Sequence, residues 1–298
     1  MRDAFCRAMV ALGQRKPYVF LTGDLGFGAL EPLQAALGLR FINAGVAEQN
    51  MVGVAAGLAA GGLQAWAYSI APFVYARPFE QVRNDVCLQR RDVKLVGNGG
   101  GYGYGSMGGT HHALEDYGSL LTLQHMTAYI PAFAGDLDAL VPVLAAEAGP
   151  AYLRLGRDEK PAGLEAGPWA PWRRLVGGGG PVLVAVGPLA GPLAGALLGM
   201  DPARRPQLWA LGRLPWVGLP TALLDAIDAG GHLAVVEEHV ATGGAGQALA
   251  ATLLALGRPP RRFTHAHARG YPEGAYGSQA YHRRENGLDP ESLLARLA

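Results

Sequence analysis

The first half of the chain alternates short, uniformly apolar segments with longer segments whose apolar residues recur at helical spacing. The short runs predict buried strands, and the longer periodic segments predict helices. Strands are expected over residues 18–21, 63–68, 93–96, 126–131 and 151–155, with helices over residues 3–12, 47–63 and 137–148. This alternation is typical of a parallel sheet that helices cover on both faces.

The second half returns to this pattern after a change of character between residues 158 and 178. There, charged residues, prolines, glycines and two tryptophans interrupt the periodic apolar positions. Beyond this stretch, strands are expected over residues 181–186, 207–211 and 232–237, with helices over residues 189–200, 221–229 and 246–256. We therefore expect an α/β protein with two doubly wound domains, which comprise residues 1–160, a linker over residues 161–178, and residues 179–298.

The composition of the chain limits the cellular locations and the kinds of partner that we expect for this protein. Of its 298 residues, 50% are hydrophobic and 16% are charged, and the formal net charge is +1. This balance gives no reason to expect a nucleic-acid partner, and no basic run suggests a membrane surface. No apolar run is long enough to cross a membrane, so the expected location is cytoplasmic. The two cysteines, Cys6 and Cys87, form neither a metal-spaced cluster nor a disulfide framework.

The stretch from residue 41 to residue 62, FINAGVAEQNMVGVAAGLAAGG, places one carboxylate, Glu48, at the start of a helix of small apolar residues. Burying an unpaired carboxylate is costly, so Glu48 must be solvated, paired or functional. An ordinary first-turn glutamate that the helix dipole favours is the alternative. Phe73 follows the strand at residues 63–68 and is likewise either a core residue or a ligand contact.

A glycine-rich segment follows the strand at residues 93–96 and ends in two adjacent histidines, His111 and His112. So many glycines exclude a helix or a central strand. A nest of backbone N–H groups that binds an anion is one possibility. The histidines are either structural or functional, and zinc is disfavoured because no third ligand has useful spacing. Asp24, in a Gly-Asp pair after the strand at residues 18–21, either binds a ligand or makes a turn.

The segment Asn-Ala-Gly-Val-Ala-Glu-Gln-Asn, followed by Gly-Val-Ala-Ala-Gly-Leu-Ala, resembles the pyrimidine-binding domain of thiamine-diphosphate enzymes of the transketolase family. The resemblance implies that Glu48 hydrogen-bonds N1′ of the aminopyrimidine and that Phe73 packs on the face of this ring. It also implies that His111, with His112 beside it, faces the reacting centre. Glu48 and His111 are therefore the expected catalytic residues, and Asp24 is a further expected cofactor contact.

The likeness extends over nearly the whole chain. Val-Val-Glu-Glu-His at residues 235–239 and the tail from residue 276 resemble the C-terminal domain of transketolase. The segment around Phe73 is closest to family members that are split into two polypeptides. Arg157 and Arg2 match family arginines that hold a substrate phosphate, so the expected substrate contacts are these two arginines and the two histidines.

One family motif is absent. The family holds the diphosphate of the cofactor through a metal bound by Gly-Asp-Gly and a later Asn, and such oxygen ligands suit Mg²⁺. This sequence contains no Gly-Asp-Gly and has no room for a third domain. We therefore expect no metal ligands on this chain. Thiamine diphosphate and Mg²⁺ are expected to bind where it meets a separate diphosphate-binding subunit, in an α2β2 heterotetramer.

Met107, Gly99 and Gly28 fall where the family has groups that contact a sugar hydroxyl or a phosphate. The donor is therefore expected to differ from ordinary ketose phosphates. The expected function is transfer of a two-carbon ketol unit to an aldehyde, in carbohydrate metabolism. The alternative is the β subunit of an enzyme that decarboxylates pyruvate or another 2-oxo acid. A non-catalytic scaffold is less favoured, because a scaffold needs no carboxylate at residue 48.

Overall fold

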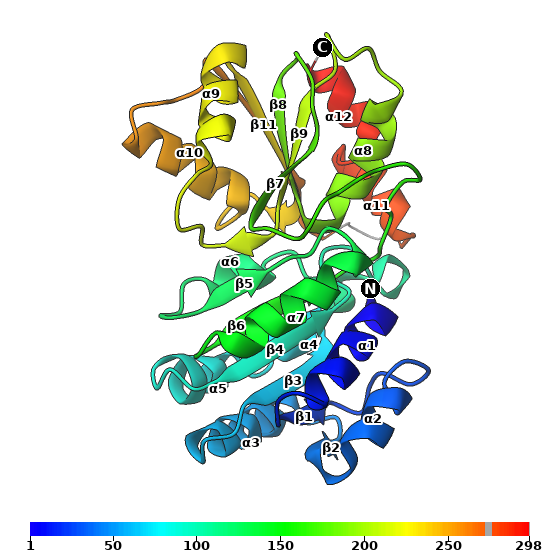
Figure 1. The fold of residues 1–298 in the computed structure, drawn as a ribbon, viewed down its shortest axis with the longest axis vertical. Helices are drawn as coiled ribbons and strands as arrows, with labels where there is room; N and C mark the ends of the chain where they lie inside the picture. The colour runs from blue at the N-terminus through cyan, green and yellow to red at the C-terminus, as the bar shows by residue number, and fades with distance from the viewer. Residues whose placement is uncertain (272–275, 298) are drawn as a thin grey trace.

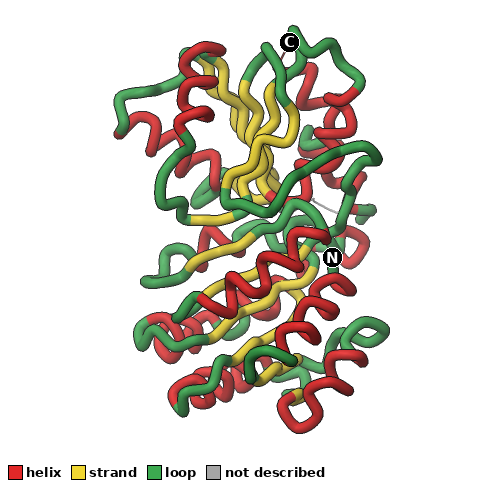
Figure 2. Tube along the Cα trace, in the orientation of Figure 1, coloured by secondary structure: helices red, strands yellow, loops and turns green. Residues whose placement is uncertain are grey.

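The computed structural model describes residues 1–271 and 276–297. It contains two α/β units, each built on its own sheet, and the N-terminus lies beside their junction (Figure 1). In each unit helices flank the strands on both sides (Figure 2). The predicted class, two α/β domains with mainly parallel sheets, is confirmed.

The first sheet has seven strands in the order β10-β5-β6-β4-β3-β1-β2. Six of them run parallel and come from the first half of the chain: β1 (Val19–Thr22), β2 (Phe41–Asn43), β3 (Ala65–Ile70), β4 (Val93–Asn98), β5 (Thr127–Tyr129) and β6 (Ala151–Leu155). The seventh, β10 (Arg213–Leu214), comes from the second half and pairs antiparallel with β5. All the parallel strands therefore end at one edge of the sheet.

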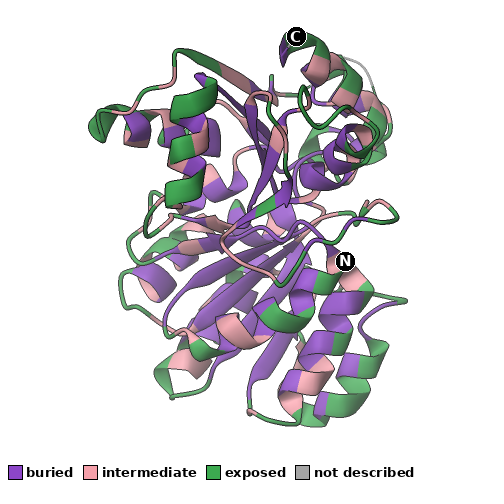
Figure 3. Ribbon diagram, turned by 45° about the horizontal axis from the view of Figure 1, so that its top comes forward, coloured by how far each residue is buried: buried purple, intermediate pink, exposed green. Residues whose placement is uncertain are grey.

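Helices cover both faces of this sheet because neighbouring strand residues point to opposite sides. One face carries α1 (Arg2–Gly13), α2 (Glu31–Leu37) and α7 (Leu137–Ala146). The other carries α3 (Glu48–Ala60), α4 (Ala71–Tyr75), the short α5 (Phe79–Gln81) and a π-helix over Val82–Cys87. Apart from the edge strand β2, the parallel strands between these layers are mostly buried, whereas the outer faces of the helices are exposed (Figure 3).

The second sheet has five strands in the order β12-β11-β8-β9-β7. They are β7 (Trp172–Val176), β8 (Val182–Val186), β9 (Gln207–Leu211), β11 (His232–Val240) and β12 (Arg262–Ala268), and only β7 runs antiparallel to its neighbour. On one face lie α9 (Thr221–Gly230) and α10 (Ala245–Ala255), and on the other lie α8 (Ala190–Leu198) and α12 (Pro290–Leu297). The remaining helices are α6 (Asp116–Leu120) and α11 (Gln279–Asn286).

The chain enters the second sheet earlier than the sequence pattern suggests. Residues 172–176, inside the stretch expected as a linker, form the edge strand β7. Gly-rich and Pro-rich flanks obscure this strand in the sequence, and its arginine residues also break an apolar run. After β9 the chain returns briefly to the first sheet as β10 before it completes the second. The boundaries at residues 160 and 179 stay a prediction.

Candidate active site

Apart from Arg2, which begins α1, the predicted site residues come from segments that leave the carboxyl ends of β1, β2, β3, β4 and β6. These strands are neighbours in the first sheet, and Ile70 at the end of β3 pairs with Asn98 at the end of β4. Ligands of open parallel sheets bind at this edge. The loops that follow these strands therefore bring residues far apart in the sequence to one place.

Glu48 is the first residue of α3 and is only 3% exposed. Its Oε1 accepts a hydrogen bond from Ser69 Oγ at 3.1 Å, and its Oε2 accepts one from Arg77 Nη1 at 2.8 Å. A Cβ at Gly23 would lie 3.3 Å from Glu48 Oε1, so this glycine leaves room for the carboxylate. The Glu48 carboxylate is thus buried, and both of its oxygens accept hydrogen bonds. An ordinary first-turn glutamate is solvated instead.

Phe73, in α4, lies beside Glu48 and shares a partner with it. The guanidinium carbon of Arg77 lies 3.6 Å from the centroid of the Phe73 ring. The same guanidinium forms the ion pair with Glu48. Glu48 and Phe73 therefore face one position, and Arg77 occupies it. Neither Arg77 nor Ser69 was expected at the site, because a lone arginine in a loop has the pattern of a solvated charge.

His111 joins Phe73 at this site. It ends the 3-10 turn Gly109–His111, and its ring lies edge-on to Phe73 with centroids 5.1 Å apart. His111 Nδ1 lies 2.9 Å from Thr110 Oγ1, which fixes the orientation of the ring. No hydrogen bond of His111 Nε2 is found among the described residues, so this nitrogen remains free to contact substrate. The structure thus brings Glu48, Phe73 and His111 together.

His112 points elsewhere. It is 1% exposed, and its ring contacts those of Tyr102 and His282 at centroid distances of 5.1 and 4.9 Å. Its Nε2 lies 3.3 Å from the carbonyl oxygen of Gly105. Burial lowers the pKa of His112 below its ordinary value, so the ring is neutral at pH 7. This position disfavours the expected substrate contact and favours a structural role in joining the two units.

Asp24 adopts a left-handed backbone conformation, with φ of 56°. Its Oδ1 accepts a hydrogen bond from Asn43 Nδ2 at 2.8 Å, and Asn43 Oδ1 accepts one from the Gly45 N–H. Asp24 therefore stabilises the loop that leads into α3. This geometry favours the turn alternative, and a cofactor contact of Asp24 stays a prediction.

Arg2 and Arg157 belong to segments that touch at the same edge of the sheet. The Gly156 N–H lies 3.5 Å from Met1 Sδ, so the start of α1 meets the loop after β6. Arg157 is exposed and Arg2 is partly exposed. Within residues 1–271 and 276–297, neither guanidinium forms a hydrogen bond or an ion pair with the protein. Both cations are therefore available to an anionic ligand.

Tyr104 fills the space beside Gly99. A Cβ at Gly99 would overlap the Tyr104 ring, and Asn98 Nδ2 donates a hydrogen bond to the Tyr104 hydroxyl at 2.7 Å. The Tyr104 and His111 ring centroids are 6.2 Å apart. Met107 is exposed and lies in the next turn of the loop. The phenol of Tyr104 therefore occupies the space beside Gly99, one of the positions at which the resemblance places a family contact.

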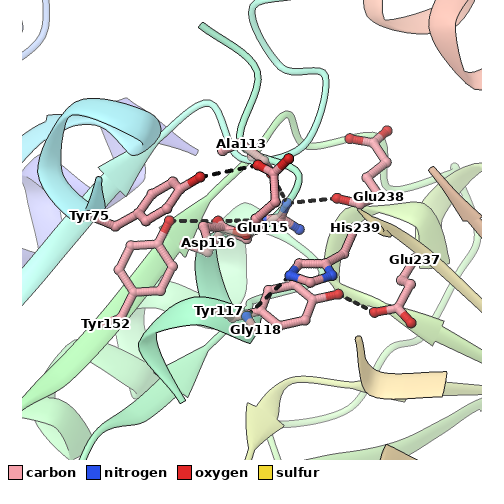
Figure 4. Close-up of polar contacts among 12 residues, drawn as sticks. Tyr75, Ala113, Glu115, Asp116, Tyr117, Gly118, Tyr152, Glu237, Glu238 and His239 are labelled. Carbon is pink, nitrogen blue, oxygen red and sulfur yellow. Dashed lines mark hydrogen bonds and ion pairs between the residues drawn. The ribbon is translucent and has the colours of Figure 1, made fainter. Parts of the chain in front are cut away.

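The glycine-rich loop is held by the junction between the two units. Buried Arg154 donates to Asp116 Oδ2 at 2.8 Å and to the carbonyl oxygens of Ala113 and Glu238 at 2.7 and 2.8 Å. Figure 4 shows these three acceptor residues gathered at the junction. Burial would lower the pKa of Arg154, but the charge of Asp116 and its neighbours raises it above the ordinary value. The Tyr102 N–H donates to Glu238 Oε2 at 3.1 Å. This network fixes the loop that carries His111.

The same network explains the two glycines at the start of the loop. A Cβ at Gly100 would overlap Arg154, and a Cβ at Gly101 would overlap Glu238. Close packing of these charged side chains therefore accounts for the glycines without an anion nest. Burial would raise the pKa of Glu238, but Arg283 holds it below the ordinary value, so the buried pair stays ionised.

Comparison with known proteins assigns the family. Residues 1–161 match the transketolase pyrimidine-binding domain. The chain is 30% identical over 269 residues to an apulose-4-phosphate transketolase subunit of Actinobacillus succinogenes, across 86% of this chain and 83% of that protein. It is 35% identical over 159 residues to a 6-deoxy-6-sulfo-D-fructose transketolase subunit of a Clostridium species, across 53% of this chain and 49% of that protein. The chain belongs to the transketolase family.

Structural similarity narrows this assignment. A solved split-gene transketolase, described as an inactive β4 tetramer, matches with a TM-score of 0.85 and 28% identity, across 99% of this chain and 96% of that one. The chain is therefore a C-terminal subunit of the split, transketolase-like kind of thiamine-diphosphate-dependent transferase. The prediction of this function over a 2-oxo acid decarboxylating subunit is confirmed.

Among the described residues, no helix has the length and apolar character needed to span a membrane.

Proposed function

We propose that Glu48 hydrogen-bonds N1′ of the aminopyrimidine of thiamine diphosphate and that Phe73 packs on the face of this ring. The observation that carries the proposal is the shared position between Glu48 and Phe73. A flat guanidinium there donates an N–H to Glu48 at 2.8 Å and stacks on Phe73 at 3.6 Å. An aminopyrimidine is also planar and also carries nitrogen atoms that hydrogen-bond along its edge. Glu48 and Phe73 therefore fit the cofactor.

When bound, the cofactor supplies the nucleophilic carbon that carries a two-carbon unit between sugars. The role of this chain is to hold a proton at N1′ through Glu48 and to exclude water from that contact, since the carboxylate is nearly fully buried. A low local dielectric strengthens this hydrogen bond. His111, through Nε2, contacts the substrate beside Phe73, and His112 keeps the loop in place.

We further propose that the diphosphate and Mg²⁺ are held by a separate subunit. The absence of Gly-Asp-Gly from this sequence supports this division, as do relatives whose names call them subunits. The face of α3 that contains Gly53 and Gly57 supports an interface close to the site, because a Cβ at either glycine would meet nothing within 4 Å in this chain. An α2β2 assembly and a cytoplasmic location, compatible with two free cysteines, complete the proposal.

The donor is proposed to be a ketose with an anionic group at its far end. Arg2 and Arg157 support this, since both cations lack protein partners among the described residues. The names of two relatives point the same way, because one specifies a phosphate and the other a sulfo group. The Tyr104 hydroxyl accepts its hydrogen bond from Asn98, so its own proton is free to donate to a sugar oxygen.

The assay that tests the function uses this chain reconstituted with its diphosphate-binding subunit. Ketoses with terminal phosphate or sulfonate, and pyruvate as the competing donor, are each offered with a panel of aldehydes. Two-carbon transfer from an anionic ketose supports the proposal. Release of carbon dioxide from pyruvate, without ketose turnover, would contradict it.

Replacing Arg157 with alanine should raise the KM for an anionic ketose about 10- to 100-fold, because a hydrogen bond to a charged group contributes about 1.5–3 kcal/mol. The kcat should change far less, since three strands of the sheet separate β6, which leads to Arg157, from β2, which leads to Glu48. Steady-state kinetics of the complex measures both. Arg174→Ala, at an exposed arginine on β7, is the matched control. An unchanged KM would remove Arg157 from the substrate site.

A further inference from the structure

Arg77 lies between α4 and α5, and its side chain is 43% exposed. Despite this exposure its guanidinium has two specific contacts. Nη1 donates to Glu48 Oε2 at 2.8 Å, and the guanidinium carbon lies 3.6 Å from the centroid of Phe73. Glu48 and Phe73 are also the two residues that bind the aminopyrimidine in the proposed function.

The chemistry of the two groups makes their contacts mutually exclusive. A guanidinium is planar, donates N–H groups along its edge and stacks on aromatic faces. In the proposed function, the aminopyrimidine hydrogen-bonds the same Glu48 carboxylate and packs on the same face of Phe73. Two flat groups cannot occupy one face of Phe73 at stacking distance, so one must leave before the other arrives.

Arg77 also compensates the charge of the buried Glu48 carboxylate while no cofactor is bound. Glu48 is 3% exposed, and a buried carboxylate without a cationic partner is strongly unfavourable. Ser69 supplies one neutral hydrogen bond at 3.1 Å, and Arg77 supplies the only cation that pairs with Glu48 among the described residues. Removing Arg77 from a pocket without cofactor would therefore leave the charge of Glu48 uncompensated.

We propose that Arg77 is a positioning residue that occupies the aminopyrimidine position until the cofactor binds. It holds the Glu48 carboxylate and the Phe73 ring in place, and it then moves outward toward solvent. Its partial exposure and the long side chain of arginine permit this movement, and Ser69 keeps its contact with Glu48 throughout. The inference rests on the proposed function, because it requires that Glu48 and Phe73 bind this ring.

An exchange of this kind lowers the apparent affinity for the cofactor, because only the fraction of molecules with an open pocket can bind. Replacing Arg77 with methionine keeps a long side chain but removes both the ion pair and the flat stacking group. In the two-chain complex with Mg²⁺, Arg77→Met should bind thiamine diphosphate about tenfold more tightly and associate faster. Arg77→Lys, which retains a charge but no planar group, should fall between this variant and wild type.

Isothermal titration gives the Kd and stopped-flow fluorescence gives the association rate, so neither measurement depends on turnover. Arg15→Met, at an exposed arginine whose side chain makes one hydrogen bond among the described residues, to the Ala11 carbonyl oxygen, should match wild type in both. Weaker or unchanged binding by Arg77→Met would overturn the inference. A crystal structure of the loaded wild-type complex provides the second test. Arg77 away from Phe73 supports the exchange, whereas Arg77 still stacked on Phe73 contradicts it.

These results are separable from failure of the proposed function. If the wild-type complex binds no thiamine diphosphate, the proposed function fails. If it binds the cofactor at Glu48 and Arg77→Met gains nothing, only the inference about Arg77 fails.

Discussion

Glu48→Gln should slow exchange of the C2 proton of bound thiamine diphosphate by about 10²–10⁴-fold, the range of general acid–base contributions. Glutamine keeps the size of the side chain and can still hydrogen-bond, but it cannot share a proton with N1′. The Ser69 hydroxyl at 3.1 Å remains available to the amide oxygen, so the local structure should persist. Exchange into deuterium oxide, followed by NMR after an acid quench, measures this step without a known substrate.

The matched control is Glu31→Gln. Glu31 is also a first-turn glutamate, at the start of α2, but it is exposed and accepts a hydrogen bond from the Gly28 N–H. This variant should exchange at the wild-type rate. If Glu48→Gln also exchanges at the wild-type rate with cofactor bound, then Glu48 is only a helix-start carboxylate and the assigned role is wrong.

Arg154→Met should cost about 3–5 kcal/mol in the free energy of unfolding, because it leaves Asp116 buried without its cation. The Arg154–Asp116 pair lies at 2.8 Å with both side chains almost fully buried. The variant also removes the donors to the Ala113 and Glu238 carbonyl oxygens, which connect the glycine-rich loop to the second unit. Urea unfolding measures the loss as a lower midpoint.

Two variants sharpen this experiment. Arg174→Met, at an exposed residue, should stay within about 0.5 kcal/mol of wild type. Adding Asp116→Leu to Arg154→Met should recover part of the loss, because no unpaired charge then remains buried. A cost below about 1 kcal/mol for Arg154→Met alone would show that the pair contributes little to holding the loop.

Strands and helices with strong apolar patterns were predictable from the sequence. β6 and β9 have the expected bounds, and most other elements differ by a few residues at their ends. The elements without a local pattern were not expected. β12 carries polar residues on an edge strand, α11 is strongly polar, and the two-residue β10 exists only because it pairs with β5.

The residues of the site also divide into those that the sequence predicts and those that it does not. Glu48, Phe73 and His111 could be predicted because motifs mark them and parallel strands bring their segments to one edge. Arg77 could not, since its role follows from a contact with Glu48 that spans 29 positions in the sequence. The burial of His112 depends on Tyr102 and His282, and only the docking of the second unit brings the latter near.

The central claim is that this chain supplies only the pyrimidine half of the cofactor site. Calorimetric titration of thiamine diphosphate with Mg²⁺ tests it most directly, with the isolated chain and the two-chain complex measured side by side. The isolated chain should bind weakly or not at all, because the diphosphate and metal contacts lie on the partner, and the complex should bind tightly. Tight binding by the isolated chain, with no partner present, would contradict the account.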